Sequence, residues 1–333
     1  MRERILDRLT AAGDGYVSGE RLSGDLGISR AAVWKHMAAL RRQGYQIEAR
    51  PRLGYRLAKR PDRLDPALVR AGLTTRVLGC RIRYLPTCGS TNLVAKELAA
   101  AGAPEGTLVL TEEQTAGRGR LGRRWVAPFG SSLLMSVLLR PALPPTEVPS
   151  LGLSAAVAVA AAVRGCTGLS PGLKWPNDLL LEGRKVGGIL LELAAEGDVV
   201  HHAVLGVGLN VNVAPASWPG EVASRATSLA AVLGRTVDRL ALLRGILSEL
   251  EERYRIWQEG GFAALRAEWI ERNVTLGRQV AVATPRGVVR GRAWDVDREG
   301  RLLLDLGGGE RLALAAGEVT LSGDNVNHED EMG

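Results

Sequence analysis

The chain has 333 residues, of which 46% are apolar and 24% charged, a composition that suits two or three globular domains and excludes disorder over most of its length. Its three cysteines (Cys80, Cys88 and Cys166) show no C-x-x-C spacing, so neither a disulfide framework nor a zinc site is expected. The N-terminus carries no apolar signal region, and the longest apolar run, 151–163, is shorter than the about 20 residues that span a bilayer. We therefore expect a cytoplasmic protein that does not cross a membrane.

The net charge of +7 is concentrated at the N-terminus. Residues 1–62 contain 13 basic and 7 acidic side chains, which accounts for nearly all of the surplus. Because Lys and Arg neutralise backbone phosphates, this distribution predicts a nucleic-acid-binding segment.

Three short helices are predicted in this segment from apolar residues at helical spacing. They cover residues 2–12, a stretch that begins at Ser18, and residues 29–43. Ser18 and Ser29 are suitable N-cap residues, and Gly44 ends the third helix. Two short helices joined by a glycine-containing turn indicate a helix-turn-helix.

The third helix and the hairpin after it form the expected DNA-binding surface. On the helix, Arg30, Trp34, Lys35 and Arg41 fall outside the apolar stripe and are available to phosphates or base edges. Residues 45–57 alternate around a basic turn, which predicts the wing of a winged helix. The candidate DNA-binding residues are Ser29, Arg30, Trp34, Lys35 and Arg52. The alternative is a small helical domain with an ordinary solvated basic face.

A short linker helix is predicted after Asp65-Pro66, and an α+β domain follows it. Helices are predicted over residues 92–101 and 150–163. Strands are predicted at 107–111, 133–140, 173–181, 185–193 and 199–213. Glycine turns make hairpins of the last three strands, so we expect a mixed, largely antiparallel sheet.

The segment from Gln114 to Trp125 (QTAGRGRLGRRW) places three glycines among four arginines. Such a loop lacks intrinsic order yet carries enough charge to wrap a polyanion. It is not a Walker A loop, because G-x-x-x-x-G-K-[ST] does not occur in the chain. An RNA-binding segment is the alternative interpretation of this string alone.

Two further strings carry polar residues in strand-like surroundings. The string Lys174-Trp175-Pro176-Asn177-Asp178 puts a proline where a strand is predicted, which indicates an edge strand or a bulge of the kind found beside active sites. In the string 184–192, Lys185 precedes two glycines at the head of an apolar strand, although a lysine there is also compatible with a solvated strand end.

Five blocks together resemble the signature blocks of biotin protein ligases in order and spacing. They are Ser90-Thr91-Asn92, 114–122, 174–178, 184–192 and 206–210. The helix-turn-helix in front resembles the bifunctional class of this family, which also represses the biotin operon. The resemblance covers nearly the whole chain.

The resemblance implies two substrates, biotin and ATP, with Mg²⁺, and an acceptor lysine on a biotin carboxyl carrier protein. It implies that Lys185 and Arg120 are catalytic, Arg120 by retaining the reactive biotinyl-AMP. The implied biotin-binding residues are Ser90, Thr91, Asn92, Gln114, Gly117, Arg118, Arg120, Lys185, Gly188 and Gly206. The implied nucleotide-binding residues are Arg120, Arg123, Trp125, Lys174, Asn177 and Asn210. Asp178 is either a Mg²⁺ ligand or an orienter of the acceptor lysine, and Trp218 is a candidate for enclosing adenine.

The C-terminal part is predicted to be helical over 237–273 and then a small β-barrel, which resembles the SH3-like domain of the family. The expected domains are 1–62 (winged helix-turn-helix), 63–273 (ligase, with a linker helix at 63–72) and 274–322 (SH3-like), followed by a disordered tail, 323–333. As a repressor, the chain is expected to dimerise with bound adenylate on operator DNA. The rival interpretations are a ligand-sensing regulator without ligase activity and a ligase without a DNA-binding role.

Overall fold

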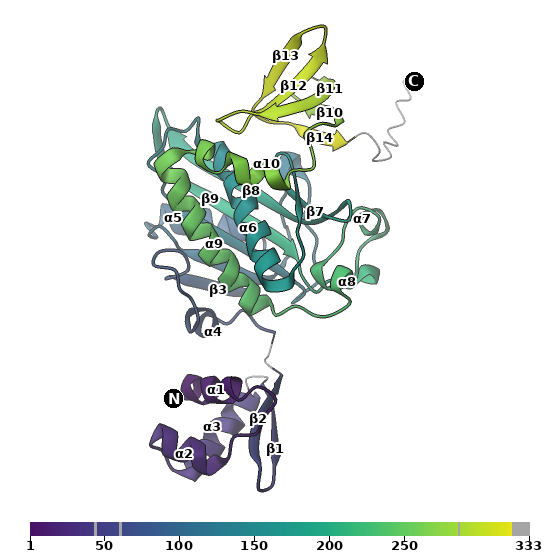
Figure 1. Cartoon of the computed structure of the whole chain (residues 1–333). Coiled ribbons are helices and arrows are strands. Elements are labelled where there is room, and N and C mark those ends of the chain that lie inside the picture. Colours follow the sequence, from purple (N-terminus) through teal and green to yellow (C-terminus); the bar gives the residue numbers. More distant parts are fainter. Residues whose placement is uncertain (43–44, 60–61, 286, 322–333) are drawn as a thin grey trace. The chain divides into compact units, whose positions relative to one another are not determined.

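The N-terminal helices begin and end at the residues that the sequence provides for capping. The computed structural model describes residues 1–42, 45–59, 62–285 and 287–321, and the helices here are α1 (Arg2–Ala11), α2 (Gly19–Leu26) and α3 (Arg30–Arg42) (Figure 1). Ser18 and Ser29 each accept a hydrogen bond from a backbone N–H three residues later, at 3.1 and 3.2 Å, so both predicted caps are confirmed. The predicted stop at Gly44 lies outside the described residues.

The predicted wing is also present, as an antiparallel pair of β1 (Gln46–Arg50) and β2 (Gly54–Lys59). Tyr55 in β2 exchanges two backbone hydrogen bonds of 2.9 Å with Val17, which ties the wing to the turn before α2. Arg41, which was expected to be available to DNA, is exposed, but its guanidinium donates to the Ile47 carbonyl at 2.8 and 3.0 Å and is thereby held against the wing. Together these residues, Met1–Arg63, form one compact unit.

The second unit begins at Leu64 and contains a seven-stranded mixed sheet with the order β3-β4-β5-β9-β8-β7-β6. Its strands are β3 (Ile82–Cys88), β4 (Leu108–Gln114), β5 (Ser132–Leu139), β6 (Gly172–Lys174), β7 (Asp178–Leu181), β8 (Arg184–Glu196) and β9 (Val199–Asn210). Strands β3 and β4 are parallel, and the other neighbouring pairs among these strands are antiparallel. This confirms the predicted mixed, largely antiparallel sheet, although β3 was not among the predicted strands.

The predicted strand over 173–181 was wrong. The chain reverses at Trp175–Asn177, so that β6 and β7 form a hairpin in which Lys174 lies opposite Asp178. Pro176 therefore occupies a turn and not a bulge within one strand, which agrees with its inability to donate a ladder hydrogen bond. The reversal presents Asp178 on β7 beside β8.

Helices cover both faces of the sheet. Helix α5 (Thr91–Ala100) packs on one face through Ala95 and Ala99, which contact Val109, Leu138 and Val204. Helices α6 (Leu151–Thr167) and α9 (Arg239–Gly260) pack against each other and the other face, where they form the main hydrophobic core (Figure 1). The shorter helices are α4 (Pro66–Arg70), α7 (Gly220–Ala223), α8 (Leu229–Leu233) and α10 (Arg266–Arg272).

Helix α6 is longer than the apolar run that predicted it. Together with the turn before it, α6 forms the helical segment Val148–Thr167. Among the described residues this is the one segment that, judged by length and composition alone, could cross a membrane. However, 72% of its most apolar window is buried within this unit. Burial against α9 accounts for its composition, as in the core helix of a globular domain.

A five-stranded antiparallel sheet with the order β13-β12-β11-β10-β14 forms the predicted SH3-like C-terminal domain. The strands are β10 (Gln279–Thr284), β11 (Gly287–Val296), β12 (Leu302–Gly307), β13 (Glu310–Leu314) and β14 (Glu318–Leu321), of which β14 was not predicted. The domain is held to the ligase core by the indole of Trp175, which donates to Gly300 O at 3.0 Å, and by the Arg266–Asp295 ion pair at 2.6 Å. The predicted disordered tail, 323–333, lies outside the described residues.

Candidate functional site

The α5 face of the sheet carries a glycine-lined floor. Residues directly opposite each other in an antiparallel pair share a face. By this register Ser136, Gly206 and Leu190 form one row, and Asp178, Gly188 and Gly208 form the next. Because three of these positions lack a side chain, the sheet is open at this point to groups from the elements above it.

Neighbouring side chains occupy part of this opening. A Cβ at Gly206 would lie 2.3 Å from Asn92 Oδ1, and one at Gly208 would lie 2.8 Å from the Trp125 ring. Glycine is therefore required at both positions for the close approach of Asn92 and Trp125. Since Gly208 was not among the predicted site residues, its role is found from the structure alone.

A polar network at the start of α5 joins three predicted biotin-binding residues. Gln114 Oε1 accepts from the backbone N–H of Thr91 at 2.8 Å and lies 3.1 Å from the Thr91 hydroxyl. The buried Ser136 hydroxyl lies 2.7 Å from Thr91 Oγ1 and 2.6 Å from Asn92 Oδ1. Gln114 Oε1 and Asn92 Oδ1 can only accept, and the two hydroxyls between them carry one proton each, so these three hydroxyl contacts share two protons and one contact is left without a donor.

The network ends at a carboxylate, Glu192 on β8. Asn92 Nδ2 donates to Glu192 Oε2 at 2.7 Å, and Lys96 lies 2.5 Å from Oε1. Burial raises the pKa of Glu192, but hydrogen bonds from Lys96 and Asn92 outweigh it and hold the pKa below its ordinary value. The carboxylate is therefore ionised at neutral pH. The positive charge of Arg118 also lowers the pKa of Glu192.

The arginine-rich loop covers an open cavity of about 710 Å³, lined by residues 116–124 and by Leu190 and Glu192 of β8. The loop is shaped by backbone hydrogen bonds from Gly119 N to Arg123 O, at 2.8 Å, and from Trp125 N to Gly117 O, at 3.0 Å. A Cβ at Gly117 would lie 2.4 Å from the Trp125 carbonyl oxygen, so this turn also requires glycine.

Two acidic groups, Asp178 and Glu318, face the cations of the site. Lys185 Nζ lies 2.5 Å from Asp178 Oδ1, and Arg123 forms an ion pair with Glu318 of β14. Burial lowers the pKa of the Arg120 guanidinium, and the charges of Asp178 and Glu318 oppose this shift. Because a guanidinium remains protonated in proteins, the loop presents permanent positive charge next to Lys185.

Polar atoms without a partner lie at one end of the floor. Asn210 and Ser132 are opposite each other in β9 and β5, and Asn210 Nδ2 donates to Thr227 O at 3.1 Å. Within the described residues, Asn210 Oδ1, Ser132 Oγ and Thr227 Oγ1 are buried and have no hydrogen-bond partner. Buried polar atoms of this kind are satisfied in a working protein by water or a ligand.

Other predicted residues have roles in holding the chain. Asn177 Nδ2 donates to Ile189 O at 2.8 Å, which fixes the β6–β7 turn against β8. The Lys185 backbone exchanges two hydrogen bonds with Arg225 and Thr227, at 2.8 and 2.9 Å. Trp218, the candidate for enclosing adenine, is 7% exposed and packs with Val213 and Ala226.

The predicted DNA-binding residues lie in the first unit. Trp34, Arg30 and Lys35 are exposed on α3, with Trp34 63% exposed. Arg52 lies at the wing tip in the left-handed region, with φ of 66°. The wing is held by Tyr16, whose hydroxyl donates to Glu48 at 2.6 Å and whose ring lies 5.3 Å from the guanidinium of Arg50.

The structure thus brings most of the predicted ligase residues to one face of one sheet. Sequence reasoning missed Ser136 and Gly208, and it quoted Glu192 without giving it a role. A serine within the apolar run SLLMSVLL was an available signal for Ser136. No local signal identified its partners, because Thr91 and Asn92 are 45 and 44 residues away along the chain.

Three segments of the chain match known protein families or domains. Residues 84–210 match the Biotin/lipoate A/B protein ligase family, residues 2–56 an HTH domain, and residues 275–322 the Biotin protein ligase C terminal domain. The chain is 41% identical over 316 residues to the bifunctional ligase/repressor BirA of Bacillus subtilis, covering 95% of this chain and 97% of that one. The chain belongs to the bifunctional biotin protein ligase/repressor family.

Other relatives match a smaller share of this chain. The bifunctional ligase/repressor BirA of Escherichia coli is 30% identical, over 88% of this chain and 89% of that protein. The biotin--[acetyl-CoA-carboxylase] ligase of Mycobacterium tuberculosis is 38% identical, over 78% of this chain and 97% of that protein. The biotin protein ligase of Aquifex aeolicus in complex with biotin and ATP superimposes with a TM-score of 0.62 at 28% identity, covering 73% of this chain and 98% of that one.

Proposed function

We propose that this chain joins biotin to ATP to give biotinyl-5′-AMP and pyrophosphate, and then transfers biotin to a lysine of a biotin carboxyl carrier protein. The observation that carries the proposal is that Arg118 and Arg120 line the loop cavity and that Asp178, the ion-pair partner of Lys185, also acts on the charge of Arg120, in a member of this family. In the first step a carboxylate approaches a triphosphate, so positive charge is needed where the two anions meet.

The biotin end is proposed at the start of α5. The Gln114–Thr91–Ser136–Asn92 network offers oriented donors and acceptors beside the open floor at Gly206 and Gly188. A neutral ureido ring on an apolar valeryl chain suits a site of this kind, which has a few fixed polar groups. The proposed biotin-binding residues are those implied by the resemblance: Ser90, Thr91, Asn92, Gln114, Gly117, Arg118, Arg120, Lys185, Gly188 and Gly206.

The nucleotide end is proposed at Asn210, Ser132 and Thr227. The unpartnered Asn210 Oδ1 is suited to accept a hydrogen bond from an exocyclic amine such as that of adenine. Arg123 is 68% exposed and can exchange Glu318 for phosphate oxygens. Trp125, Lys174 and Asn177 are the remaining proposed nucleotide-binding residues.

The chemistry follows from this placement. A biotin carboxylate oxygen attacks the α-phosphorus, the bond to the β-phosphate breaks, and pyrophosphate leaves. Lys185 and Arg120 stabilise the charge on the α-phosphate oxygens and then hold the adenylate. The neutral acceptor lysine attacks the biotinyl carbonyl carbon, AMP leaves, and the nitrogen loses a proton.

Mg²⁺ is proposed to enter with the triphosphate. The described residues contain no group of three His, Cys, Asp or Glu side chains that would hold a metal alone. Mg²⁺ is commonly held by one or two carboxylates plus substrate phosphates, so Asp178 fits as the protein ligand once Lys185 turns to the phosphate. The ion would shield the phosphate charge.

The first unit is proposed to bind operator DNA and repress biotin synthesis, with α3 in the major groove and the wing on the backbone. Its proposed contacts are Ser29, Arg30, Trp34, Lys35 and Arg52. A homodimer formed by the adenylate-loaded chain would present two recognition helices to a palindromic site. These roles place the protein in the cytoplasm.

Pyrophosphate release tests the ligase proposal. The purified full chain is given ATP and Mg²⁺ with biotin, with lipoate, or with neither. Biotin-dependent release and accumulation of biotinyl-AMP are expected. Release with lipoate alone would change the substrate assignment, and no release with either would leave a ligand-sensing regulator. A salt-dependent gel shift with biotin-operon DNA separates a repressor from a ligase without a DNA-binding role.

A further inference from the structure

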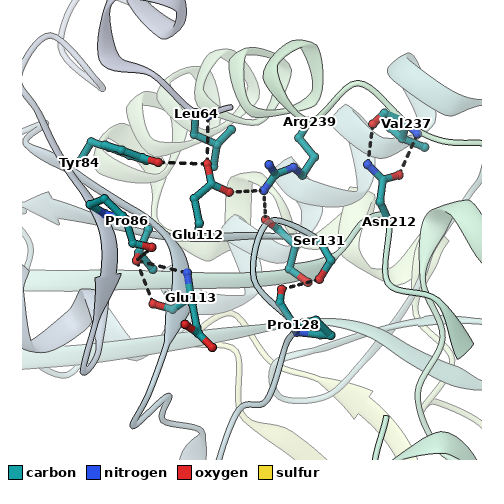
Figure 2. A network of polar contacts seen from close by, with 12 residues as sticks. Leu64, Tyr84, Pro86, Glu112, Glu113, Pro128, Ser131, Asn212, Val237 and Arg239 are labelled. Carbon is teal, nitrogen blue, oxygen red and sulfur yellow. Dashed lines mark hydrogen bonds and ion pairs between the residues drawn. The ribbon is translucent and has the colours of Figure 1, made fainter. Parts of the chain in front are cut away.

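A buried ion pair lies outside the proposed chemistry. Arg239, the first residue of α9, places Nη1 2.7 Å from Glu112 Oε2 on β4. The two side chains are 0% and 3% exposed. Figure 2 shows the contact between them. Two charges this far from water are held only where geometry and hydrogen bonds compensate for their desolvation.

The second carboxylate oxygen of Glu112 holds the start of the ligase unit. Glu112 Oε1 accepts from the backbone N–H of Leu64 at 3.2 Å and lies 3.4 Å from the Tyr84 hydroxyl (Figure 2). Leu64 is fully buried and directly follows Arg63, the last residue of the DNA-binding unit. The first residue of the ligase unit is thus hydrogen-bonded through its backbone to the Glu112 carboxylate.

The same pair also contacts the proposed ligand site. Arg239 Nη1 donates to Ser132 O at 2.9 Å, and Ser132 lies opposite Asn210, where the unpartnered polar atoms gather. The Glu112 carbonyl accepts from Gly130 N at 3.1 Å, in the segment that connects the arginine-rich loop to β5. Arg239 is therefore hydrogen-bonded to the nucleotide end, and Glu112 to the segment that leads from the arginine-rich loop into β5.

A core of this size does not need a charged pair for stability, because an apolar pair of similar volume is often as stabilising. What the charged pair supplies is a fixed geometry between three backbone positions: Leu64, Ser132 and Gly130. Hydrogen-bonded networks of this kind can carry coupling between distant sites.

We propose that Glu112 and Arg239 are positioning residues that transmit occupancy of the nucleotide end to Leu64, where the DNA-binding unit joins. They would set how strongly biotinyl-AMP changes operator affinity, without taking part in ligation. The inference rests on the proposed function, because it needs both the adenylate and an operator site.

The test uses the full chain carrying Glu112→Gln together with Arg239→Gln, which removes both charges and leaves no buried ion unpaired. Operator affinity is measured with and without biotin plus ATP, and pyrophosphate release is measured in parallel. The wild type is expected to show an affinity ratio in the range typical of coupled sites, roughly 5- to 150-fold. The double variant should keep pyrophosphate release and lose the ratio.

Two controls distinguish coupling from general destabilisation. Tyr84→Phe removes the longest contact to Glu112 and should keep the ratio. Arg253→Gln with Glu268→Gln removes another ion pair of α9, outside this network, and should also keep it. If the double variant does not fold, Arg239→Lys retains the charge with a shorter side chain and should reduce the ratio while preserving pyrophosphate release.

The outcomes separate this inference from the proposed function. A folded, active double variant, or a folded Arg239→Lys chain, with an unchanged ratio overturns the inference. So does a wild-type chain that forms the adenylate but binds operator DNA equally well with and without it. A wild-type chain that forms no adenylate overturns the proposed function itself.

Discussion

Lys185 Nζ lies 2.5 Å from Asp178 Oδ1, and this contact joins two strings of the sequence that were singled out separately. It exists because the β6–β7 hairpin presents Asp178 opposite Gly188 of β8, over which the Lys185 side chain passes. An ammonium held by one carboxylate can transfer to a phosphate without leaving an uncompensated charge, if a cation that enters with the nucleotide takes its place.

Lys185→Gln should lower the rate of pyrophosphate release by about 10²- to 10³-fold, because it removes a fixed charge from the α-phosphate. Arg184→Gln is the matched control. Arg184 is the adjacent residue on β8, but its partner is the exposed Glu182, so release should stay close to that of the wild type. Equal losses in the two variants would argue against the assignment of Lys185.

Arg120→Gly should release biotinyl-AMP into solution, since Arg120 is proposed to hold the adenylate. The expected sign is biotinylation of bystander proteins, read with a streptavidin blot after incubation with biotin and ATP. Arg124→Gly alters the same loop at an exposed arginine that donates to Thr115 O, and it should not release the adenylate. Limited proteolysis of the wild type near Arg120 should slow when biotinyl-AMP binds. Cleavage that the ligand does not slow would contradict loop closure.

Gly206→Ala should raise the KM for biotin by at least about tenfold, because its Cβ would lie 2.3 Å from Asn92 Oδ1 and displace the network at α5. The KM for ATP should change much less. Gly152→Ala in α6 is the control, because no atom other than those of its chain neighbours and the surrounding helix backbone lies within 4 Å of its Cβ position. It should leave both KM values unchanged and stabilise the fold by about 0.5–1 kcal/mol. A Gly206→Ala chain with unchanged biotin KM would remove Gly206 from the site.

Glu192→Gln should flatten the dependence of stability on pH below the ordinary carboxyl pKa of 4.5. The pKa of Glu192 is lowered in the folded chain, so its ionised form contributes stability above pH 4.5, and this contribution is lost as the pH falls through the lower folded value. Urea unfolding at several pH values from about 6 to about 3 measures the effect. Glu196→Gln, at an 88% exposed side chain of β8, should leave the profile unchanged.

Arg52→Ala and Lys35→Ala should each weaken operator binding and reduce the slope of log affinity against log salt by about 1, the change expected when one phosphate contact is lost. Arg8→Ala is a control in the same unit, because Arg8 lies 3.6 Å from Asp25 and has no proposed role in DNA binding. If all three substitutions alter the slope equally, the assignment of α3 and the wing as the DNA-binding surface would be wrong.

The elements with local causes were predicted from the sequence. Ser18, Ser29 and Asp65 cap helices through bonds to backbone groups two or three residues away, so the cap and its partner appear together in the sequence. The hairpins at Gly183 and Gly197 follow from glycines that adopt positive φ.

Two predictions differ from the structure where a residue meets a partner in another element. Arg41 was expected to face DNA, but folding of the wing brings Ile47 O to its guanidinium. The β6–β7 reversal was interpreted as one strand, because the residues on either side of Pro176 have strand-like patterns. In both cases the deciding contact is made by another element.

By itself the sequence determined which chemical groups the protein carries, the order of most of its helices and strands, and a concentration of positive charge at its N-terminus, because these depend on residue type and short-range spacing. Only the tertiary structure decided that Ser136 meets Asn92, that Lys185 meets Asp178, and that Glu112 meets Arg239 across 127 residues. Such contacts depend on strand register and helix packing. These are set by the whole fold, in which buried polar groups must find hydrogen-bond partners, and short-range sequence patterns do not reveal them.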